Sequence, residues 1–239
     1  MPPATIHTFD STLLNIEDLT ATVRNFTFST PKDFSFNAGE FVTALINHPT
    51  HGCVERPYSI ASDPKRAGSI DLCIRNVGGD GTDHFFHMQL GDPVQFKSAL
   101  GDMALDSTMT EKDIVLVSSG TGISPYPAIV PALLDNGFKH TLRLFSGFRH
   151  ETEILYAQLW DAYQSTFPNF AFTPIVSRPR SDTYAGERGR VQSLIQKYVP
   201  PQFEGHFFLC GSQEMVGETA QLLSSRGVPP ERIIYDRYA

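Results

Sequence analysis

The stretch that decides the fold runs from Asp113 to Pro125 and reads DIVLVSSGTGISP. Its apolar first part is typical of a strand buried on both faces of a parallel sheet. Gly120-Thr121-Gly122 then turns the chain, and Pro125 is favourable in the first turn of a helix. This unit lets backbone N–H groups approach an anion closely, so it predicts a phosphate site. A plain tight turn is the alternative, because the stretch is neither a GxGxxG fingerprint nor a Walker loop.

The sequence that follows repeats the alternation of apolar strand and helix. The expected strands are TLRLFSG, FAFTPIVS, GHFFLCG and ERIIYDRY, and the expected helices are PYPAIVPALLDNG, ETEILYAQLWDAYQ, RVQSLIQKYV and QEMVGETAQLLSSRG. Apolar strands joined by helices predict a doubly wound parallel α/β sheet. Pro131 should kink or shorten the first of these helices, because it removes a backbone hydrogen bond.

The first part of the chain follows a different pattern. The short strand-like runs TVRNFTFS, EFVTALI, RPYSIAS, SIDLCIRNV and DPVQFKS are separated by turn residues in NAG, DPKRAG and GGDG. Short strands with frequent turns predict an antiparallel β-barrel. We therefore expect two domains, a barrel over residues 1–106 and an α/β domain over residues 107–239, with the boundary near DSTMTEKD.

Composition excludes several classes of protein. The net charge of −7 argues against a nucleic-acid binder, and no stretch of about 18 apolar residues could span a membrane. The first residues, MPPATIHTFDSTLL, have neither a basic start nor an apolar segment, so we expect a cytoplasmic protein. The three cysteines cannot hold an iron–sulfur cluster, and two histidine pairs without further ligands do not predict a metal site.

Two motifs in the first half contain residues suited to a ligand with a flat ring and a phosphate. In ERPYSIAS, alternation along a strand places Arg56 and Tyr58 on one face and Ser59 on the other. In VGGDGTDHF, Gly79, Gly81 and Thr82 could present N–H groups and a hydroxyl to a phosphate. The alternatives are a sheet surface where Arg56 pairs with an acid, and a simple hairpin turn.

Taken in order, these motifs resemble those of the ferredoxin–NADP reductase superfamily of flavoproteins, particularly its compact bacterial-type members. The resemblance extends from NAGEFV almost to the end of the chain. It rests on Arg56-Pro57-Tyr58-Ser59, on the turn from Gly79 to Thr82, on GTGISP and on Cys210-Gly211. It implies a flavin-binding barrel followed by a nucleotide-binding α/β domain, with FAD and NADP(H) as cofactors; FMN in place of FAD is the alternative.

The resemblance also implies roles for individual residues. Tyr58 would pack against the flavin ring, Ser59 would bond near its N5 edge, and Arg56 would pair with the pyrophosphate. The small polar residues Ser59, Cys210 and Asp236 would surround the reacting atoms. Further expected cofactor contacts are Pro57, Cys73, Ile74, Arg75, Gly79, Gly81, Thr82, Gly120, Thr121, Gly122, Gly211, Met215 and Tyr238. Ser212 departs from the pattern, since relatives commonly have proline there.

A preference for NADPH is expected from cations around the third strand of the second domain. Arg149 follows the preceding strand, Ser177 and Arg178 end the third strand, and Arg190 begins the next helix. Fixed cations and hydroxyl donors suit the dianionic 2′-phosphate. Asp182 and Glu187 could instead hold free ribose hydroxyls, as acids do in NAD enzymes, or the loop could be a solvated surface without selectivity.

The resemblance thus implies a monomeric NADPH-dependent reductase that passes electrons to a separate carrier such as ferredoxin or flavodoxin. A reductase component of an oxygenase and a reductase of free flavins are alternatives. A flavin-carrying sensor subunit without turnover is the alternative from another class. GTGISP and Cys210-Gly211 argue against the sensor, because both motifs serve nicotinamide binding in the family.

Overall fold

The structure is a computed structural model that describes residues 7–48, 50–101, 103–105 and 109–238. Contacts divide the chain into two compact units. The first contains residues up to Ala104 together with Pro127–Ala132, and the second contains Leu105–Tyr126 and Leu133–Ala239. The expected boundary between residues 106 and 107 lies outside the described residues.

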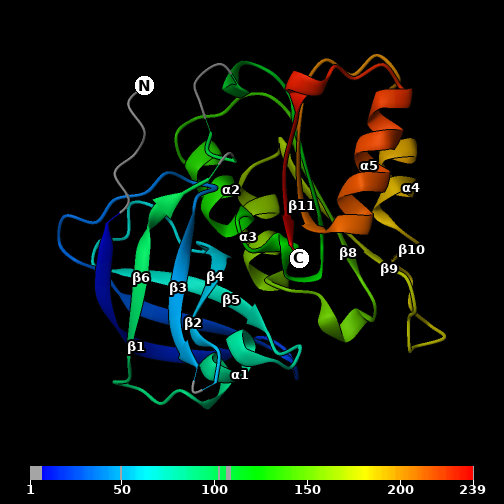
Figure 1. The fold of residues 1–239 in the computed structure, drawn as a ribbon. Coiled ribbons are helices and arrows are strands. Elements are labelled where there is room, and N and C mark those ends of the chain that lie inside the picture. The colour runs from blue at the N-terminus through cyan, green and yellow to red at the C-terminus, as the bar shows by residue number, and fades with distance from the viewer. Residues whose placement is uncertain (1–6, 49, 102, 106–108, 239) are drawn as a thin grey trace. The chain divides into compact units, whose positions relative to one another are not determined.

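The first unit is built on a six-stranded antiparallel sheet with the order β4-β3-β6-β1-β2-β5 (Figure 1). A bridge between Ile60 and Leu72 joins the segment after β4 to β5, so the two ends of the sheet approach one another as in a barrel. Phe26, Phe28 and Phe96 are fully buried inside it. The elements are β1 (Thr8–Asp18), β2 (Val23–Ser29), β3 (Phe41–His48), β4 (Gly52–Ser59), β5 (Ser69–Arg75), α1 (Asp80–His87) and β6 (Pro93–Leu100).

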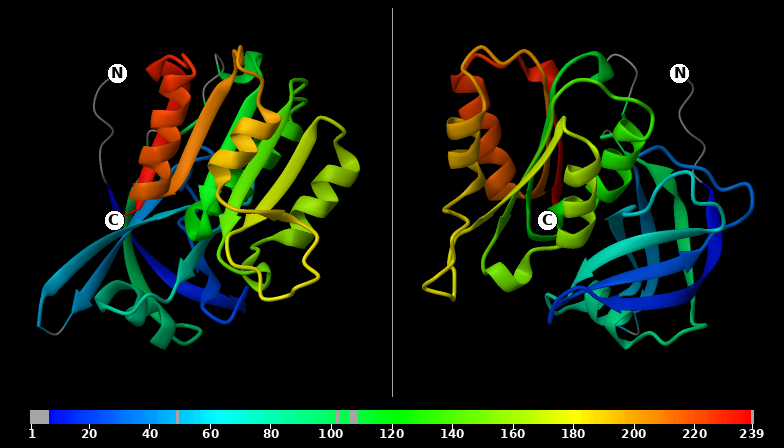
Figure 2. Two further views of the ribbon diagram at one scale, coloured as in Figure 1. Left: turned by 90° about the vertical axis from the view of Figure 1, so that its right-hand side faces the viewer. Right: turned by 180° about the vertical axis from the view of Figure 1, so that it is seen from behind.

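The second unit is a six-stranded parallel sheet with the order β10-β9-β8-β7-β11-β12. Helix α3 lies on one face of this sheet and α4 and α5 lie on the other (Figure 2). The strands are β7 (Ile114–Ser119), β8 (Leu142–Phe148), β9 (Phe170–Val176), β10 (Glu187–Arg188), β11 (His206–Ser212) and β12 (Ile233–Tyr238). The helices are α3 (Ala157–Thr166), α4 (Val191–Tyr198) and α5 (Gln213–Ser225), and α2 (Tyr126–Leu134) is divided between the two units.

Short 3-10 turns complete the second unit: η1 (Met109–Glu111), η2 (Gly120–Ile123), η3 (Glu151–Glu153) and η4 (Pro230–Arg232). Residues from α4, α5 and the sheet form one buried apolar cluster, in which Val117, Phe145 and Leu209 are fully enclosed. The strands of this sheet are apolar on both faces because helices cover both faces. The expected fold class, an antiparallel barrel followed by a doubly wound parallel sheet, is confirmed.

The structure adds to the sequence-based expectations in several local features and differs from them in others. Strand β1 was not expected, because TFDSTLLNIED lacks a regular apolar alternation. The segment GGDGTDHF forms the start of helix α1 and not a hairpin turn. The helix expected from Glu151 begins only at Ala157, because Tyr156 adopts a left-handed conformation with φ 57°. Helix α2 continues through Pro131 to Leu134, but it has only 9 residues.

Candidate functional site

In the second unit, β7 and β11 are neighbours although they are far apart in the sequence. The chain adds β8 and β9 on one side of β7, and then adds β11 and β12 on the other side. Ligands of open α/β sheets bind outside the carboxyl ends of the strands at such a reversal. The GTG motif follows β7, and Cys210-Gly211 lies near the carboxyl end of β11. Two motifs from distant parts of the sequence therefore meet at the expected nucleotide site.

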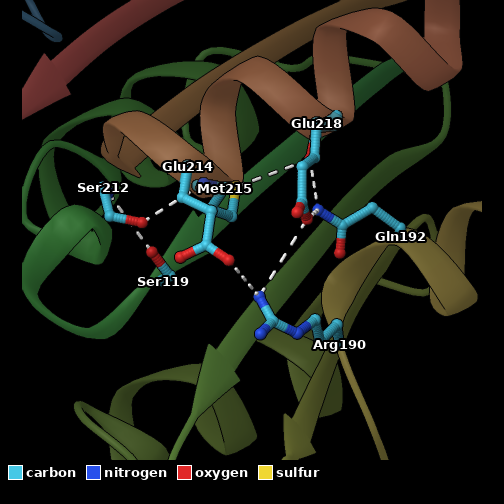
Figure 3. Close-up of polar contacts among 8 residues, drawn as sticks. Ser119, Arg190, Gln192, Ser212, Glu214, Met215 and Glu218 are labelled. Atoms are coloured by element: carbon cyan, nitrogen blue, oxygen red, sulfur yellow. Dashed lines mark hydrogen bonds and ion pairs between the residues drawn. The ribbon is translucent and has the colours of Figure 1, made fainter.

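Two glycines allow these motifs to approach one another closely. A Cβ at Gly122 would overlap the carbonyl group of Cys210. A Cβ at Gly211, which has φ 145°, would lie 2.6 Å from Ser119 Oγ. The N–H of Ser212 also lies 3.4 Å from Ser119 Oγ, a contact drawn in Figure 3. The backbone of the turn after β7 thus contacts the backbone at the end of β11 directly. Side chains at the two glycines would push these segments apart.

The turn η2 and the start of α2 lie where the sequence predicts a phosphate site. Gly120 adopts φ 54°, and the Thr121 carbonyl accepts hydrogen bonds from the N–H and the hydroxyl of Ser124. Helix α2 then begins at Tyr126, close to the expected Pro125. The first N–H groups of a helix have no partner inside the helix, and its dipole attracts a negative charge. Of the two interpretations of this segment, we therefore favour a phosphate site over a plain tight turn.

Tyr126, which was not expected to take part, links the two central strands. Its hydroxyl is fully buried and lies 2.8 Å from the Val117 carbonyl and 2.9 Å from the Phe208 carbonyl. Burial, with the neighbouring Cys210 and Asp236 adding to it, raises the pKa of Tyr126 well above its usual value. The hydroxyl therefore stays protonated and acts as a donor between β7 and β11.

Cys210 and Asp236, two of the expected active-site residues, are direct partners on β11 and β12. Cys210 is fully buried. Met215, in the first turn of α5, is only 6% exposed. Ser212 caps this helix, since its hydroxyl accepts the N–H of Met215 at 3.2 Å. The serine that replaces the usual proline thus has a structural role. The second unit brings together the expected residues Gly120, Thr121, Gly122, Cys210, Gly211, Met215 and Asp236.

The expected cations of the second unit fall in two places. Arg149 and Arg178 lie together at the carboxyl ends of β8 and β9, where the Arg178 N–H donates to the Arg149 carbonyl at 2.8 Å. Ser177 stands beside them, with its N–H 2.9 Å from the Phe148 carbonyl. Both arginine side chains are exposed. Two cations and a hydroxyl are thus available at this edge of the sheet.

Arg190 is engaged differently, with helix α5. Its Nη1 lies 3.1 Å from a Glu214 carboxylate oxygen and 4.0 Å from a Glu218 oxygen (Figure 3). Gln192 donates to Glu218 at 3.2 Å and to Thr219 at 3.3 Å. Arg190 therefore starts α4 as expected, but two carboxylates already neutralise it. An anionic ligand would have to compete with Glu214 for this guanidinium.

In the first unit, Arg56 and Tyr58 lie on the face of β4 that meets α1. A Cβ at Gly81 would lie 2.9 Å from Arg56 Cγ, and the Tyr58 ring contacts the Phe85 ring edge-on at 5.2 Å. Gly81 and Phe85 are four residues apart on α1, so they share one side of the helix. Burial raises the pKa of Tyr58 to about 12. The expected placement of Arg56 and Tyr58 on one face is thereby confirmed.

The start of α1 fits the pyrophosphate of a flavin nucleotide. Gly79, with φ 103°, precedes the helix, and Gly81 leaves room beneath Arg56. The Thr82 hydroxyl is buried and has no hydrogen-bond partner among the described residues. A buried hydroxyl without a partner is unfavourable, and a phosphate oxygen at the helix start would supply one. Arg56, Gly81 and Thr82 therefore suit the group that the resemblance implies, whereas the Gly79 N–H, which was expected to face the phosphate, donates to the Asp83 carboxylate at 3.0 Å.

The remaining residues expected to bind the flavin lie on β4 and β5 of the first unit, except Tyr238, which lies on β12 of the second unit. The bridge between Ile60 and Leu72 brings the end of β4 beside β5, which places Ser59 near Cys73. Ser59, Cys73 and Ile74 are buried, Pro57 is exposed, and Arg75 is half-buried. The backbone of Tyr238 pairs with Ser212 at the end of β12, but its side chain lies outside the described residues.

Several residues at these sites were not expected from the sequence. Tyr126 carries the only polar side chain in the helix YPAIVPALL, and this contrast could have identified it. Ser119 and Glu214 flank the GTG and Cys-Gly motifs, so their positions beside these motifs were the available signal. Glu151 accepts hydrogen bonds from the backbone N–H groups of Arg180 and Ser181. No local sequence pattern indicated these contacts, because only the fold brings the two segments together.

The fold and these sites are those expected of a protein that binds a flavin nucleotide and a nicotinamide nucleotide. Residues 10–105 match the family model of an oxidoreductase FAD-binding domain, and residues 116–221 match that of an oxidoreductase NAD-binding domain. The chain belongs to the ferredoxin–NADP reductase superfamily. FAD and a nicotinamide adenine dinucleotide are its cofactors.

Relatives of this chain include a phenol hydroxylase protein and a ferredoxin–NADP reductase. It is 26% identical to a phenol hydroxylase P5 protein of Acinetobacter pittii, over 92% of this chain and 63% of that protein. It is 28% identical to ferredoxin–NADP reductase B of Sorangium cellulosum, over 96% of this chain and 97% of that protein. This chain therefore spans less than two thirds of the phenol hydroxylase component, but nearly all of the Sorangium reductase.

Solved structures share the same fold. An Amycolatopsis cytochrome P450 reductase superposes with a TM-score of 0.88 at 24% identity, over 97% of this chain and 70% of that one. A Neisseria gonorrhoeae ferredoxin–NADP+ reductase with bound FAD and NADP superposes with a TM-score of 0.82 at 22% identity, over 96% and 98%. Within the part of the chain that the structure describes, no helix is long and apolar enough to cross a membrane.

Proposed function

We propose that the protein oxidises NADPH through a bound FAD and passes the electrons singly to a separate carrier such as ferredoxin or flavodoxin. The bound cofactors supply the redox chemistry, in which a hydride moves between nicotinamide and flavin. The chain's own residues bind and orient the two nucleotides. Ser59, Cys210 and Asp236 are proposed to line the reacting edge, because each is small and polar.

The pairing of Arg149 with Arg178 carries the NADPH part of this proposal. Their main chains are joined by a 2.8 Å hydrogen bond, so two exposed guanidinium groups start from one point on the sheet edge. Ser177 adds a hydroxyl beside them. A guanidinium group can bind a dianionic 2′-phosphate through two parallel charged hydrogen bonds, so two such groups at this position suit NADPH.

A reductase component of an oxygenase is the second candidate. The resemblance to the Acinetobacter phenol hydroxylase component, at 26% identity, favours it. The resemblance to the Sorangium ferredoxin–NADP reductase, at 28% identity, supports the first candidate. Comparing the rates at which the reduced protein reduces ferredoxin, flavodoxin, free FMN and a purified oxygenase component would distinguish the acceptors.

Steady-state assays with both nucleotides test the NADPH preference. Each charged hydrogen bond to phosphate contributes about 1.5 to 3 kcal/mol, so Arg178→Ala should raise the KM for NADPH about 10- to 150-fold. NADH should be little affected, because it lacks the 2′-phosphate. Lys139→Ala is the matched control, since it removes an exposed cation beside the amino end of β8, at the opposite edge of the sheet.

Two results would contradict this assignment. Equal wild-type efficiency with NADH would remove the preference, and an equal loss for both nucleotides in Arg178→Ala would remove Arg178 from 2′-phosphate recognition. Bleaching of the flavin by NADPH without oxygen separates an enzyme from a flavin-carrying sensor. A sensor subunit without turnover would keep its colour.

A further inference from the structure

The loop that carries Arg178 is held by contacts with one short segment of the neighbouring connection. The loop runs from the end of β9 at Val176 to the two-residue strand β10. Such a long connection has few backbone partners of its own, so its conformation depends on what it packs against. The segment that meets it is Arg149-His150-Glu151, between β8 and η3.

Glu151 makes the central contacts. One carboxylate oxygen accepts the N–H of Ser181 at 2.7 Å and that of Arg180 at 3.2 Å, and the other accepts the N–H of Arg180 at 2.9 Å. Both oxygens are therefore engaged by two consecutive backbone N–H groups. Charged acceptors form stronger hydrogen bonds than neutral ones, as at the start of a helix.

The two preceding residues hold Arg178 itself. The Arg178 N–H donates to the Arg149 carbonyl at 2.8 Å, and the Arg178 carbonyl accepts from His150 Nδ1. Three successive residues thus fix the backbone from Arg178 to Ser181 at three points. The Arg180 N–H, ahead of the other backbone donors, lowers the pKa of Glu151, so its carboxylate remains charged and able to accept near neutral pH.

We infer that Glu151 is a positioning residue for nucleotide selectivity, which holds the loop so that Arg178 presents its guanidinium to the 2′-phosphate. This rests on the proposed NADPH preference. Glu151 acts through the backbone of Arg180 and Ser181 and not by contact with the nucleotide. Its negative charge alone would repel a phosphate, so positioning and simple charge make opposite predictions for its removal.

The probes are adenosine 2′,5′-bisphosphate and AMP, which differ only in the 2′-phosphate and need no flavin chemistry. Their affinities are measured by calorimetry on the FAD-loaded protein. Loss of a capping-type acceptor costs about 1 to 2 kcal/mol, so Glu151→Ala should weaken bisphosphate binding about 5- to 30-fold and leave AMP binding unchanged. Glu151→Gln keeps one acceptor oxygen and should weaken it less.

Two further variants complete the design. In an Arg178→Ala background, adding Glu151→Ala should weaken bisphosphate binding by no more than about 2-fold. The effects of the two substitutions should not add, because Glu151 acts through Arg178. Glu231→Ala removes an exposed carboxylate from η4 of the same unit and should change neither affinity. Hydrogen exchange at the Arg180 and Ser181 amides gives a readout without nucleotide, and both should exchange faster in Glu151→Ala.

The outcomes separate this inference from the proposed function. If the wild-type protein does not distinguish the two probes, the NADPH proposal fails and this inference fails with it. If it does distinguish them but Glu151→Ala keeps wild-type bisphosphate affinity, only this inference fails. Tighter bisphosphate binding in both Glu151 variants would also overturn it, because it would mean that Glu151 acts by charge repulsion.

Discussion

Arg190 and Glu214 form an ion pair across two helices, with 3.1 Å between the guanidinium Nη1 and the carboxylate Oε1. Each side chain is 64% exposed, so water and salt screen the pair. An exposed pair of this kind contributes at most about 1 kcal/mol to stability. A ligand phosphate could therefore replace the Glu214 carboxylate as the partner of Arg190. Arg190 can therefore change partner when a nucleotide binds.

We predict that Glu214→Gln strengthens NADPH binding about 2- to 5-fold, because it releases Arg190 from its carboxylate partner. NADH binding should not change. The gain should disappear in an Arg190→Ala background, which is the control for a general effect of charge. Dissociation constants of both oxidised nucleotides provide the measurement. An equal gain with and without Arg190 would mean that Arg190 does not contact the phosphate.

Thr82→Val should have opposite effects on the flavin-free and flavin-loaded forms. The Thr82 hydroxyl is buried without a partner among the described residues, so its removal should leave the flavin-free protein unchanged or slightly more stable. Loss of a charged hydrogen bond to phosphate should weaken FAD binding about 10- to 150-fold. Thermal unfolding of the flavin-free protein and FAD titration measure the two effects. Unchanged FAD affinity would exclude Thr82 from the site.

Gly122→Ala should abolish binding of the nicotinamide nucleotide while FAD remains bound. The new methyl group would overlap the Cys210 carbonyl group, which must move away from the GTG turn. Gly217→Ala in α5 is the matched control, because nothing lies within 4 Å of its Cβ position. Alanine in a helix interior should stabilise that variant by about 0.5 to 1 kcal/mol. Spectral titration with NADP+ would reveal any binding that survives in Gly122→Ala.

Tyr126→Phe should destabilise the protein by about 1 to 3 kcal/mol, because the buried Val117 and Phe208 carbonyls lose their shared donor. The control is Tyr163→Phe, whose hydroxyl makes an exposed 3.2 Å contact with Asp135. That change should fall within about 0.5 kcal/mol of the wild type. Urea unfolding measures both, and equal midpoints for the two variants would show that the Tyr126 bonds contribute nothing.

The sequence by itself determined the fold class and the order of the motifs. The apolar run before Gly120 and the alternation of strands with helices identify a covered parallel sheet, since only strands buried on both faces are apolar throughout. The turn-rich strands before Ala104 identify an antiparallel barrel. The strand β1 was missed because its 11 residues include few regularly spaced apolar side chains.

Only the tertiary structure decided which side chains act on one another. The sequence suggested the same role for Arg178 and Arg190, but the fold places Arg190 against two carboxylates of α5. Glu151 meets the backbone of Arg180 and Ser181 only because β8 and β9 are adjacent. Local patterns of polarity follow from the chain's own periodicity, whereas ion pairs and hydrogen bonds between distant residues depend on which strands become neighbours.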